Sequence, residues 1–162
     1  MSFGFEFLVL QVKEANIDSR ETLEGVIDQI FKKSLAEPYF CGVYAEFCLR
    51  LSEIMPSFDV EGPPEETETK KITFKRVLLN KCQNEFEVGT KEHKEAEGGK
   101  EGEEGLTKQQ IEANVVAARK KMLGNIKFVG ELYKLKMLTE RIMHECIKLL
   151  LGFAVSVHLH RT

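Results

Sequence analysis

The sequence predicts an all-α protein made of successive helical hairpins. Apolar residues recur every three or four positions in several segments, which is the spacing of one face of a helix. Prolines and short polar runs separate these segments and mark the turns between helices. The chain has 162 residues, of which 43% are apolar and 30% charged, and this composition suits one soluble domain with its own core.

The first well-marked helix spans about 20–35. Residues 1–12 before it carry no capping signal, and their apolar pattern fits a strand or a helix equally well. Asp18 and Glu21 have the spacing of a capping box and predict where the helix begins. The Glu-Pro pair at 37–38 ends it, because the residue before a proline avoids the α region. The predicted core residues of this helix are Leu23, Val26, Ile27, Ile30, Phe31 and Leu35.

The next helix spans about 39–54, and the proline at position 56 ends it. Only two or three residues separate it from the previous helix, so the two must fold back on each other. Residues 20–54 are therefore expected to form a helical hairpin. The face that its second helix should bury carries Phe40, Val43, Tyr44, Phe47, Leu51 and Ile54.

Two acidic segments interrupt the helical pattern. Residues 56–71 contain three prolines and dense charge, which predicts a linker. Residues 88–106 contain five glycines and few apolar side chains. Burial there cannot offset the entropy of ordering, so we expect a long mobile acidic loop. A helix over about 72–87 lies between the two segments, with its predicted core residues at Phe74, Val77, Leu78, Cys82 and Phe86.

The longest helical signal covers 107–152. Thr107 and Gln110 have capping-box spacing and predict where its first helix begins. Gly124 and Gly130 lie inside that helix, where each costs about 1 kcal/mol relative to alanine. Either a neighbouring helix or a bound surface comes close to them, or they mark a bend or tight packing alone. The apolar stripe of this helix is Ile111, Val115, Ala118, Met122, Ile126, Val129 and Tyr133.

A second helix of this segment is expected at about 140–151. Thr139 should cap its start, and Gly152 stands where the glycine after a helix end belongs. The tail at 153–162 alternates between apolar and polar residues and fits no helical pattern. The predicted core residues of this helix are Ile142, Met143, Cys146, Ile147 and Leu150.

The hairpins have a period of about 35–45 residues once the loops are set aside, which is typical of HEAT-type repeats. No repeat is visible by identity, so a compact helical bundle is the competing architecture. The period favours a HEAT-type solenoid of helical hairpins and leaves the bundle open.

The sequence contains no motif for catalysis, and we expect neither enzyme activity nor a cofactor. The nearest approach to a phosphate-binding loop, at 98–100, lacks the upstream glycine and the following Ser or Thr. His144 and Cys146 are two positions apart, so they point to different helix faces and should not share a metal ion. The four cysteines have no C-x-x-C spacing and are expected to be reduced thiols in or near the core.

No membrane or export signal is visible in the sequence. The longest apolar run is far too short to span a bilayer. Residues 1–10 have no basic segment, include Glu6 and lead to no cleavage site, so we do not expect a signal peptide. These features favour a cytoplasmic protein.

Basic residues gather on the segment 107–152, which carries nine Lys or Arg against four Glu. Lys120, Lys127 and Lys134 recur every seven residues and so lie on one helix face. Glu131 interrupts this face and can pair with Lys127, an interaction worth about 0.2–0.5 kcal/mol.

This basic face has two interpretations. It is either a solvated, salt-bridged surface or a contact for RNA phosphates or an acidic protein patch. No aromatic platform is visible, so any RNA contact should be directed to the backbone. The candidate RNA-binding residues are Arg119, Lys120, Lys121, Lys127, Lys134, Lys136 and Arg141.

Three stretches, in the same order, closely resemble one known domain. They are residues 25–48 (GVIDQIFKKSLAEPYFCGVYAEFC), 72–87 (ITFKRVLLNKCQNEFE) and 123–152 (LGNIKFVGELYKLKMLTERIMHECIKLLLG). The sequence resembles the middle domain of eukaryotic translation initiation factor 4 gamma, particularly its plant form. The similarity covers about 11–152, so residues 1–10 and 153–162 are expected to lie outside it.

The resemblance implies a translation initiation scaffold. The family's middle domain is a crescent of about five HEAT-type hairpins, so the resemblance implies an all-α fold that is a partial HEAT-type solenoid of about three hairpins, with a long mobile acidic loop. It holds the DEAD-box RNA helicase subunit of the cap-binding complex, contacts mRNA and, in animals, helps to recruit the ribosome-bound initiation factor 3 complex. The ATP chemistry belongs to the helicase.

The sequence departs from the family at both ends. The first helix of the first hairpin is replaced or cut short before Gln11, and the last two hairpins are missing after Gly152. A truncated gene model, a splice form or a fragment would give this pattern. The helix at 140–151 would then expose the face that stacks on the next hairpin. Two alternatives stay open: a helical-repeat scaffold of nuclear cap binding or mRNA decay, and a truncated product without function.

Overall fold

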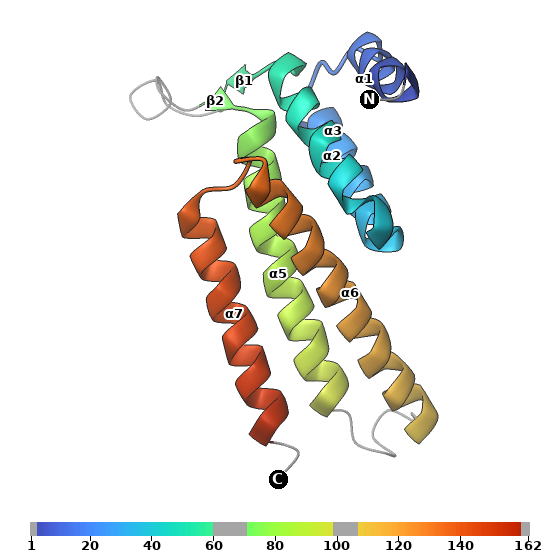
Figure 1. Cartoon of the computed structure of the whole chain (residues 1–162), viewed down its shortest axis with the longest axis vertical. Coiled ribbons are helices and arrows are strands. Elements are labelled where there is room, and N and C mark those ends of the chain that lie inside the picture. Colours follow the sequence, from blue (N-terminus) through green and yellow to red (C-terminus); the bar gives the residue numbers. More distant parts are fainter. Residues whose placement is uncertain (1–2, 60–70, 99–106, 160–162) are drawn as a thin grey trace.

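The computed structural model describes residues 3–59, 71–98 and 107–159, and most of these lie in helices (Figure 1). The predicted all-α class is confirmed, with one short antiparallel strand pair in addition. In chain order the elements are α1 (Phe3–Glu14), α2 (Arg20–Ala36), the 3₁₀ turn η1 (Pro38–Phe40), α3 (Cys41–Ile54), β1 (Phe58–Asp59), β2 (Lys71–Ile72), α5 (Phe74–Gly98), α6 (Lys108–Lys134) and α7 (Glu140–Leu159).

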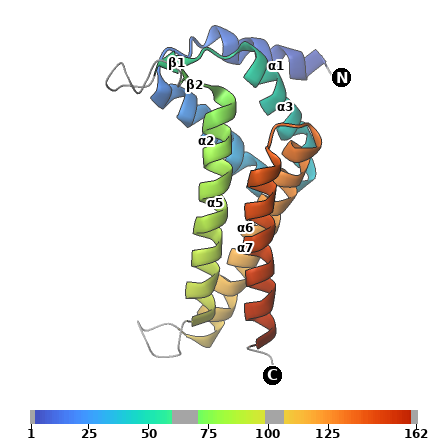
Figure 2. The same cartoon turned by 90° about the vertical axis from the view of Figure 1, so that its left-hand side faces the viewer.

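The helices stack in two layers. In one layer α1 contacts α3 and α3 contacts α6, and in the other α2 contacts α5 and α5 contacts α7. Helix α6 also packs along α5, and Figures 1 and 2 show α5, α6 and α7 running side by side away from the α1–α3 end. Alternate stacking of this kind is typical of a helical-hairpin solenoid, so the predicted architecture is confirmed over a compact bundle.

Phenylalanines fill the core where the layers meet. Phe31 of α2 and Phe128 of α6 are 1% and 0% exposed, and their ring centroids lie 5.0 Å apart in an edge-to-face arrangement. Phe74 and Phe86 of α5 are buried as well. The prediction of free thiols in the core is confirmed for all four cysteines, namely Cys41, Cys48, Cys82 and Cys146.

The ambiguous N-terminal pattern folds as a helix, α1. The turn after it holds Asn16 in the left-handed region at φ 53°, which asparagine tolerates. The predicted cap Asp18 is wrong, because Ser19 caps α2: its hydroxyl accepts a hydrogen bond from the Thr22 N–H at 3.2 Å. Either residue type can cap a helix, so capping-box spacing alone could not choose between the two.

The buried face of α3 differs from the predicted one. Phe40 and Val43, expected in the core, are 55% and 49% exposed. The 3₁₀ turn η1 takes up Phe40, so α3 begins only at the following residue, and Val43 lies on the face of α3 opposite its buried residues. The residues that α3 does bury fully are Cys41, Ala45, Cys48 and Leu51.

The predicted linker at 56–71 begins and ends in a strand pair. Phe58 lies opposite Ile72 in this antiparallel pair, which joins the end of α3 to the start of α5. Residues 60–70 lie outside the described part of the chain.

The predicted mobile loop at 88–106 is wrong over 88–98, because α5 continues as a helix through these residues. Packing against α6 outweighs their polar composition. One of the contacts is an ion pair between Glu92 and Lys121 of α6, with a nitrogen–oxygen distance of 2.8 Å. The remainder of the predicted loop, 99–106, lies outside the described residues.

Helix α6 begins at the predicted capping box. The Thr107 hydroxyl accepts a hydrogen bond from the Gln110 N–H at 3.3 Å, and the Gln110 side chain accepts one from the Thr107 N–H at 2.8 Å. The predicted apolar stripe is only partly right, since Tyr133 is 41% exposed. Helix α6 contacts α5 as well as α2 and α3, so one stripe could not describe its buried surface. Its buried residues are Met122, Gly124, Asn125, Phe128, Val129 and Leu132.

The two glycines of α6 have different surroundings. A Cβ added to Gly124 would lie 3.3 Å from Leu35 Cδ2 and 3.6 Å from Leu35 Cα, so α2 comes close there. A Cβ added to Gly130 would meet nothing within 4 Å outside its own helix. Close helix approach therefore accounts for Gly124 alone.

Helix α7 begins as predicted but runs further. The Thr139 hydroxyl accepts a hydrogen bond from the Ile142 N–H at 3.4 Å. The predicted helix end at Gly152 is wrong, because α7 continues over 153–159. One glycine inside a helix costs only about 1 kcal/mol, too little to end it. Ile147, expected to be buried, is 47% exposed, since α7 packs mainly against α5.

Candidate functional site

Three of the seven candidate cations line one groove on α6. Arg119, Lys120 and Lys127 border a hollow of about 390 Å³, which we call the basic groove. Lys120 lies seven residues before Lys127, on the same face of the helix, and Arg119 is adjacent to Lys120. The rest of the lining is largely apolar and consists of Pro38 from η1 with Val116, Leu123 and Gly124 from α6.

An exposed aromatic ring lies beside the basic groove. Tyr39 in η1 is 95% exposed, and the Lys127 Nζ lies 5.6 Å from the centroid of its ring, a cation–π distance. No aromatic platform was predicted from the sequence, so Tyr39 was missed. A signal was present, because an aromatic residue directly after a helix-ending proline is placed in a surface turn.

Two other candidate cations are held by carboxylates. Lys121 lies on the α5 side of α6, where it pairs with Glu92. Lys134 pairs with Glu131 at 2.7 Å, so the predicted pair between Lys127 and Glu131 is wrong. An exposed pair of this kind contributes about 0–1 kcal/mol, which leaves Lys134 available to a partner.

The last two candidates, Lys136 and Arg141, lie at and after the turn between α6 and α7. Lys136 has a φ of 58°, in the left-handed region. The Lys136 N–H donates to the Tyr133 carbonyl at 2.9 Å, and the Met137 N–H donates to the Leu132 carbonyl at 3.0 Å. These bonds form a Schellman motif in which lysine occupies the usual glycine position. Lys136 and Arg141 are exposed but do not line the basic groove.

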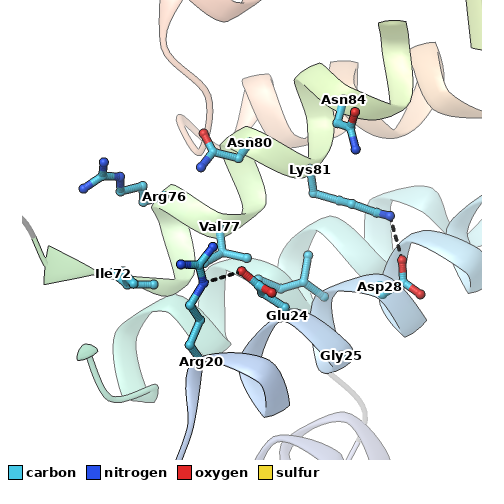
Figure 3. A pocket seen from close by; sticks show the side chains of 11 residues that line it. Arg20, Glu24, Gly25, Asp28, Ile72, Arg76, Val77, Asn80, Lys81 and Asn84 are labelled. Atoms are coloured by element: carbon cyan, nitrogen blue, oxygen red, sulfur yellow. Dashed lines mark hydrogen bonds and ion pairs between the residues drawn. The ribbon is translucent and has the colours of Figure 1, made fainter. Parts of the chain in front are cut away.

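A second groove, of about 700 Å³, lies between α2 and α5 (Figure 3). We call it the α2–α5 groove. Lys81 of α5 reaches across it, with its Nζ 2.6 Å from an oxygen of Asp28 and 2.8 Å from an oxygen of Glu85. Arg20 and Glu24 of α2 pair with each other at 2.6 Å along one wall. Sequence reasoning missed this groove, because its walls come from helices about 50 positions apart in the chain.

Asp28 and Lys81 of the α2–α5 groove stay charged near neutral pH. Hydrogen bonds from Lys32 and Lys81 lower the pKa of Asp28 below its ordinary value, although burial opposes them. Burial lowers the pKa of Lys81, but hydrogen bonds to Asp28 and Glu85 outweigh this effect and raise it. Both pKa values are shifted away from neutral pH, so Asp28 and Lys81 do not exchange protons readily there. Their ion pair links α2 to α5.

The buried thiols among the remaining described residues are part of the core and are not reactive groups. Burial raises the pKa values of the Cys48 and Cys82 thiols, which keeps them protonated and weakly nucleophilic. Within 3–59, 71–98 and 107–159, no group of three or more His, Cys, Asp or Glu could hold a metal ion. No helix in these ranges is long and apolar enough to cross a membrane.

The chain is similar to known proteins over almost its whole length. The MIF4G domain family matches residues 4–160, a range that reaches into both terminal segments expected to lie outside the similarity. The chain is 52% identical over 156 residues to eukaryotic translation initiation factor 4G of Arabidopsis thaliana, covering 96% of the chain and 9% of that protein. It is 55% identical over 150 residues to eukaryotic translation initiation factor 4G of Oryza sativa subsp. japonica, covering 92% of the chain and 8% of that protein.

A mammalian relative is similar over almost the same range. The chain is 43% identical over 155 residues to eukaryotic translation initiation factor 4 gamma 1 of Mus musculus, covering 91% of the chain and 9% of that protein. The chain thus spans about a tenth of the length of the curated relatives it matches.

Proposed function

Because the chain belongs to the MIF4G domain family, we propose that it is a cytoplasmic scaffold of translation initiation. It binds the DEAD-box RNA helicase subunit of the cap-binding complex and mRNA, and it contacts the ribosome-bound initiation factor 3 complex. The scaffold is not itself an enzyme, since the helicase supplies the ATP chemistry. Family membership over residues 4–160 supports this proposal, as does the solenoid, which offers extended surfaces for several partners.

The basic groove is the proposed RNA contact. Lys120 and Lys127 would neutralise phosphates, and the exposed ring of Tyr39 could stack on a base. The position of the Lys127 Nζ, 5.6 Å from the Tyr39 ring centroid, supports the RNA contact most directly. A cation beside an exposed ring is a combination that single-stranded RNA can use without sequence preference.

A pull-down tests helicase binding. The chain, immobilised on resin, is expected to retain the purified DEAD-box helicase subunit from solution. A longer middle domain serves as the positive control for the helicase preparation. Retention by the longer domain but not by this chain would defeat helicase binding here.

Titration of fluorescent oligouridylate tests the RNA contact. The double change Lys120→Glu and Lys127→Glu should weaken binding at least tenfold and reduce the slope of log affinity against log salt by about one to two. Tyr39→Ala should weaken binding with little change of slope, because stacking releases no counterions.

Lys91→Glu is the matched control, since Lys91 lies on α5 with its side chain 79% exposed and does not line the basic groove. It should leave the affinity almost unchanged. An equal loss of affinity in Lys91→Glu would show that the basic groove has no particular role.

A further inference from the structure

Three polar side chains of α5 line the α2–α5 groove and have no partner among the described residues. Arg76, Asn80 and Asn84 follow one another at intervals of four residues, and Figure 3 shows the two asparagines in a row along the helix. All three are exposed. Within the described residues, none of their side chains makes a hydrogen bond or ion pair with another residue. No described residue therefore competes with a ligand for their polar groups.

The spacing of these side chains matches that of an extended polypeptide. Four residues of an α-helix rise about 6.0 Å. Two residues of an extended chain advance about 6.6–6.8 Å, so every second peptide unit can meet every fourth helix residue. Each asparagine side chain offers a carbonyl acceptor and an amide donor, which complement the N–H and C=O of a peptide unit. Asn80 and Asn84 can thus hold two peptide units of one strand.

The charges in the groove indicate which residue such a strand carries. Lys81 is paired with Asp28, and Arg20 is paired with Glu24. The guanidinium of Arg76 is the charge in this lining that no carboxylate of the described residues neutralises. A carboxylate on the ligand, about 6 Å along from the peptide unit held by Asn80, would complement it.

We propose that the α2–α5 groove binds an extended segment of a partner protein, about five residues long, that carries an acidic side chain. Asn80 and Asn84 bind its main chain, and Arg76 binds its carboxylate two residues from the first bound peptide unit. Glu24 and Asp28, the carboxylates of this lining, are each paired with a cation, so among the described residues Arg76 supplies one uncompensated positive charge, which suits a single carboxylate better than a run of phosphates. The site is separate from the basic groove and does not depend on helicase or RNA binding.

A positional hexapeptide array tests the proposal with the full chain. Each peptide carries one Asp, one Lys or neither at a fixed position, and the other positions are randomised. The chain should retain the Asp series in preference to the Lys series and the uncharged series. The retained peptides should tolerate substitution at the positions next to Asp, because main-chain contacts read no side chain.

Variants of the chain then assign the contacts. The double change Asn80→Ala and Asn84→Ala should weaken binding of the best Asp peptide at least tenfold in fluorescence anisotropy. Arg76→Glu should reverse the preference from Asp to Lys, which a merely structural role would not do. Asn114→Ala, at an exposed asparagine of α6 outside the groove, is the matched control and should bind like the parent. All the substituted residues are exposed, and circular dichroism confirms that each variant is folded.

Three results would overturn the proposal. The first is an array without preference for Asp. The second is unchanged peptide binding in the double asparagine variant. The third is that oligouridylate displaces the bound peptide from the parent chain but not from the Arg76→Glu variant. That result would assign the groove to nucleic acid instead.

Discussion

Replacing the two glycines of α6 with alanine tests the helix packing that shapes the basic groove. Alanine is favoured over glycine inside a helix by about 0.8–1.0 kcal/mol. At Gly130 a Cβ meets nothing within 4 Å, so Gly130→Ala should raise the free energy of unfolding by nearly that amount. At Gly124 the new Cβ would lie 3.3 Å from Leu35 Cδ2, so strain against α2 should cancel most of the gain.

Thermal unfolding followed by circular dichroism measures the difference. For a chain of this size about 1 kcal/mol corresponds to about 2–4 °C in Tm. Gly130→Ala should raise Tm by that amount, Gly124→Ala should change it little, and Gly124→Val should lower it, because overpacking costs about 1–3 kcal/mol. If Gly124→Ala raised Tm as much as Gly130→Ala, α2 would not approach α6 as described, and the groove wall formed by Gly124 and Pro38 would be misplaced.

Three further predictions follow from the turn, the ion pairs and the core. Lys136→Gly should stabilise the chain by about 0.5–1 kcal/mol, measured by denaturant unfolding. Glycine relieves about 1–2 kcal/mol of left-handed strain, which exceeds its added entropy cost. The control Lys134→Gly, inside α6, should destabilise the chain. Asp28→Asn should lower the free energy of unfolding at pH 7 by less than about 1 kcal/mol. The pKa of Asp28 in the folded chain lies below its ordinary value of 3.8, so the stabilisation by Asp28 is present above pH 3.8 and is lost as the pH falls through the folded pKa. A stability difference between the parent and Asp28→Asn that persisted in acid would contradict this account. Cys48 and Cys82, with pKa values raised by burial, should react with iodoacetamide only in denaturant, as mass spectrometry of the modified peptides would show.

Local signals predicted the helices well, because helix starts depend on a few neighbouring residues. The capping box of Thr107 and Gln110 and the cap at Thr139 are both present where the sequence indicates. Features that depend on tertiary packing could not be read in this way. Residues 88–98 look like a loop by composition, yet α6 packs against them and keeps them helical.

The candidate site could be predicted only in part for the same reason. The spacing of Lys120 and Lys127 correctly places two cations on one face of α6. Tyr39 joins them only through the fold, because η1 packs against α6. The pairing of Lys121 with Glu92 also depends on α5 extending beyond its predicted end. The spacing of residues along one helix predicts which of them share a face, but it does not predict which residues of another helix pack against that face.

Formation of a ternary complex tests the central proposal most directly. The chain, the DEAD-box helicase subunit and fluorescent oligouridylate are mixed and separated by size-exclusion chromatography. A scaffold that holds helicase and RNA together predicts that all three elute in one peak, and that the Lys120→Glu and Lys127→Glu variant loses RNA from that peak while keeping the helicase. Elution of the chain apart from the helicase, under conditions in which the helicase alone binds RNA, would contradict the proposal.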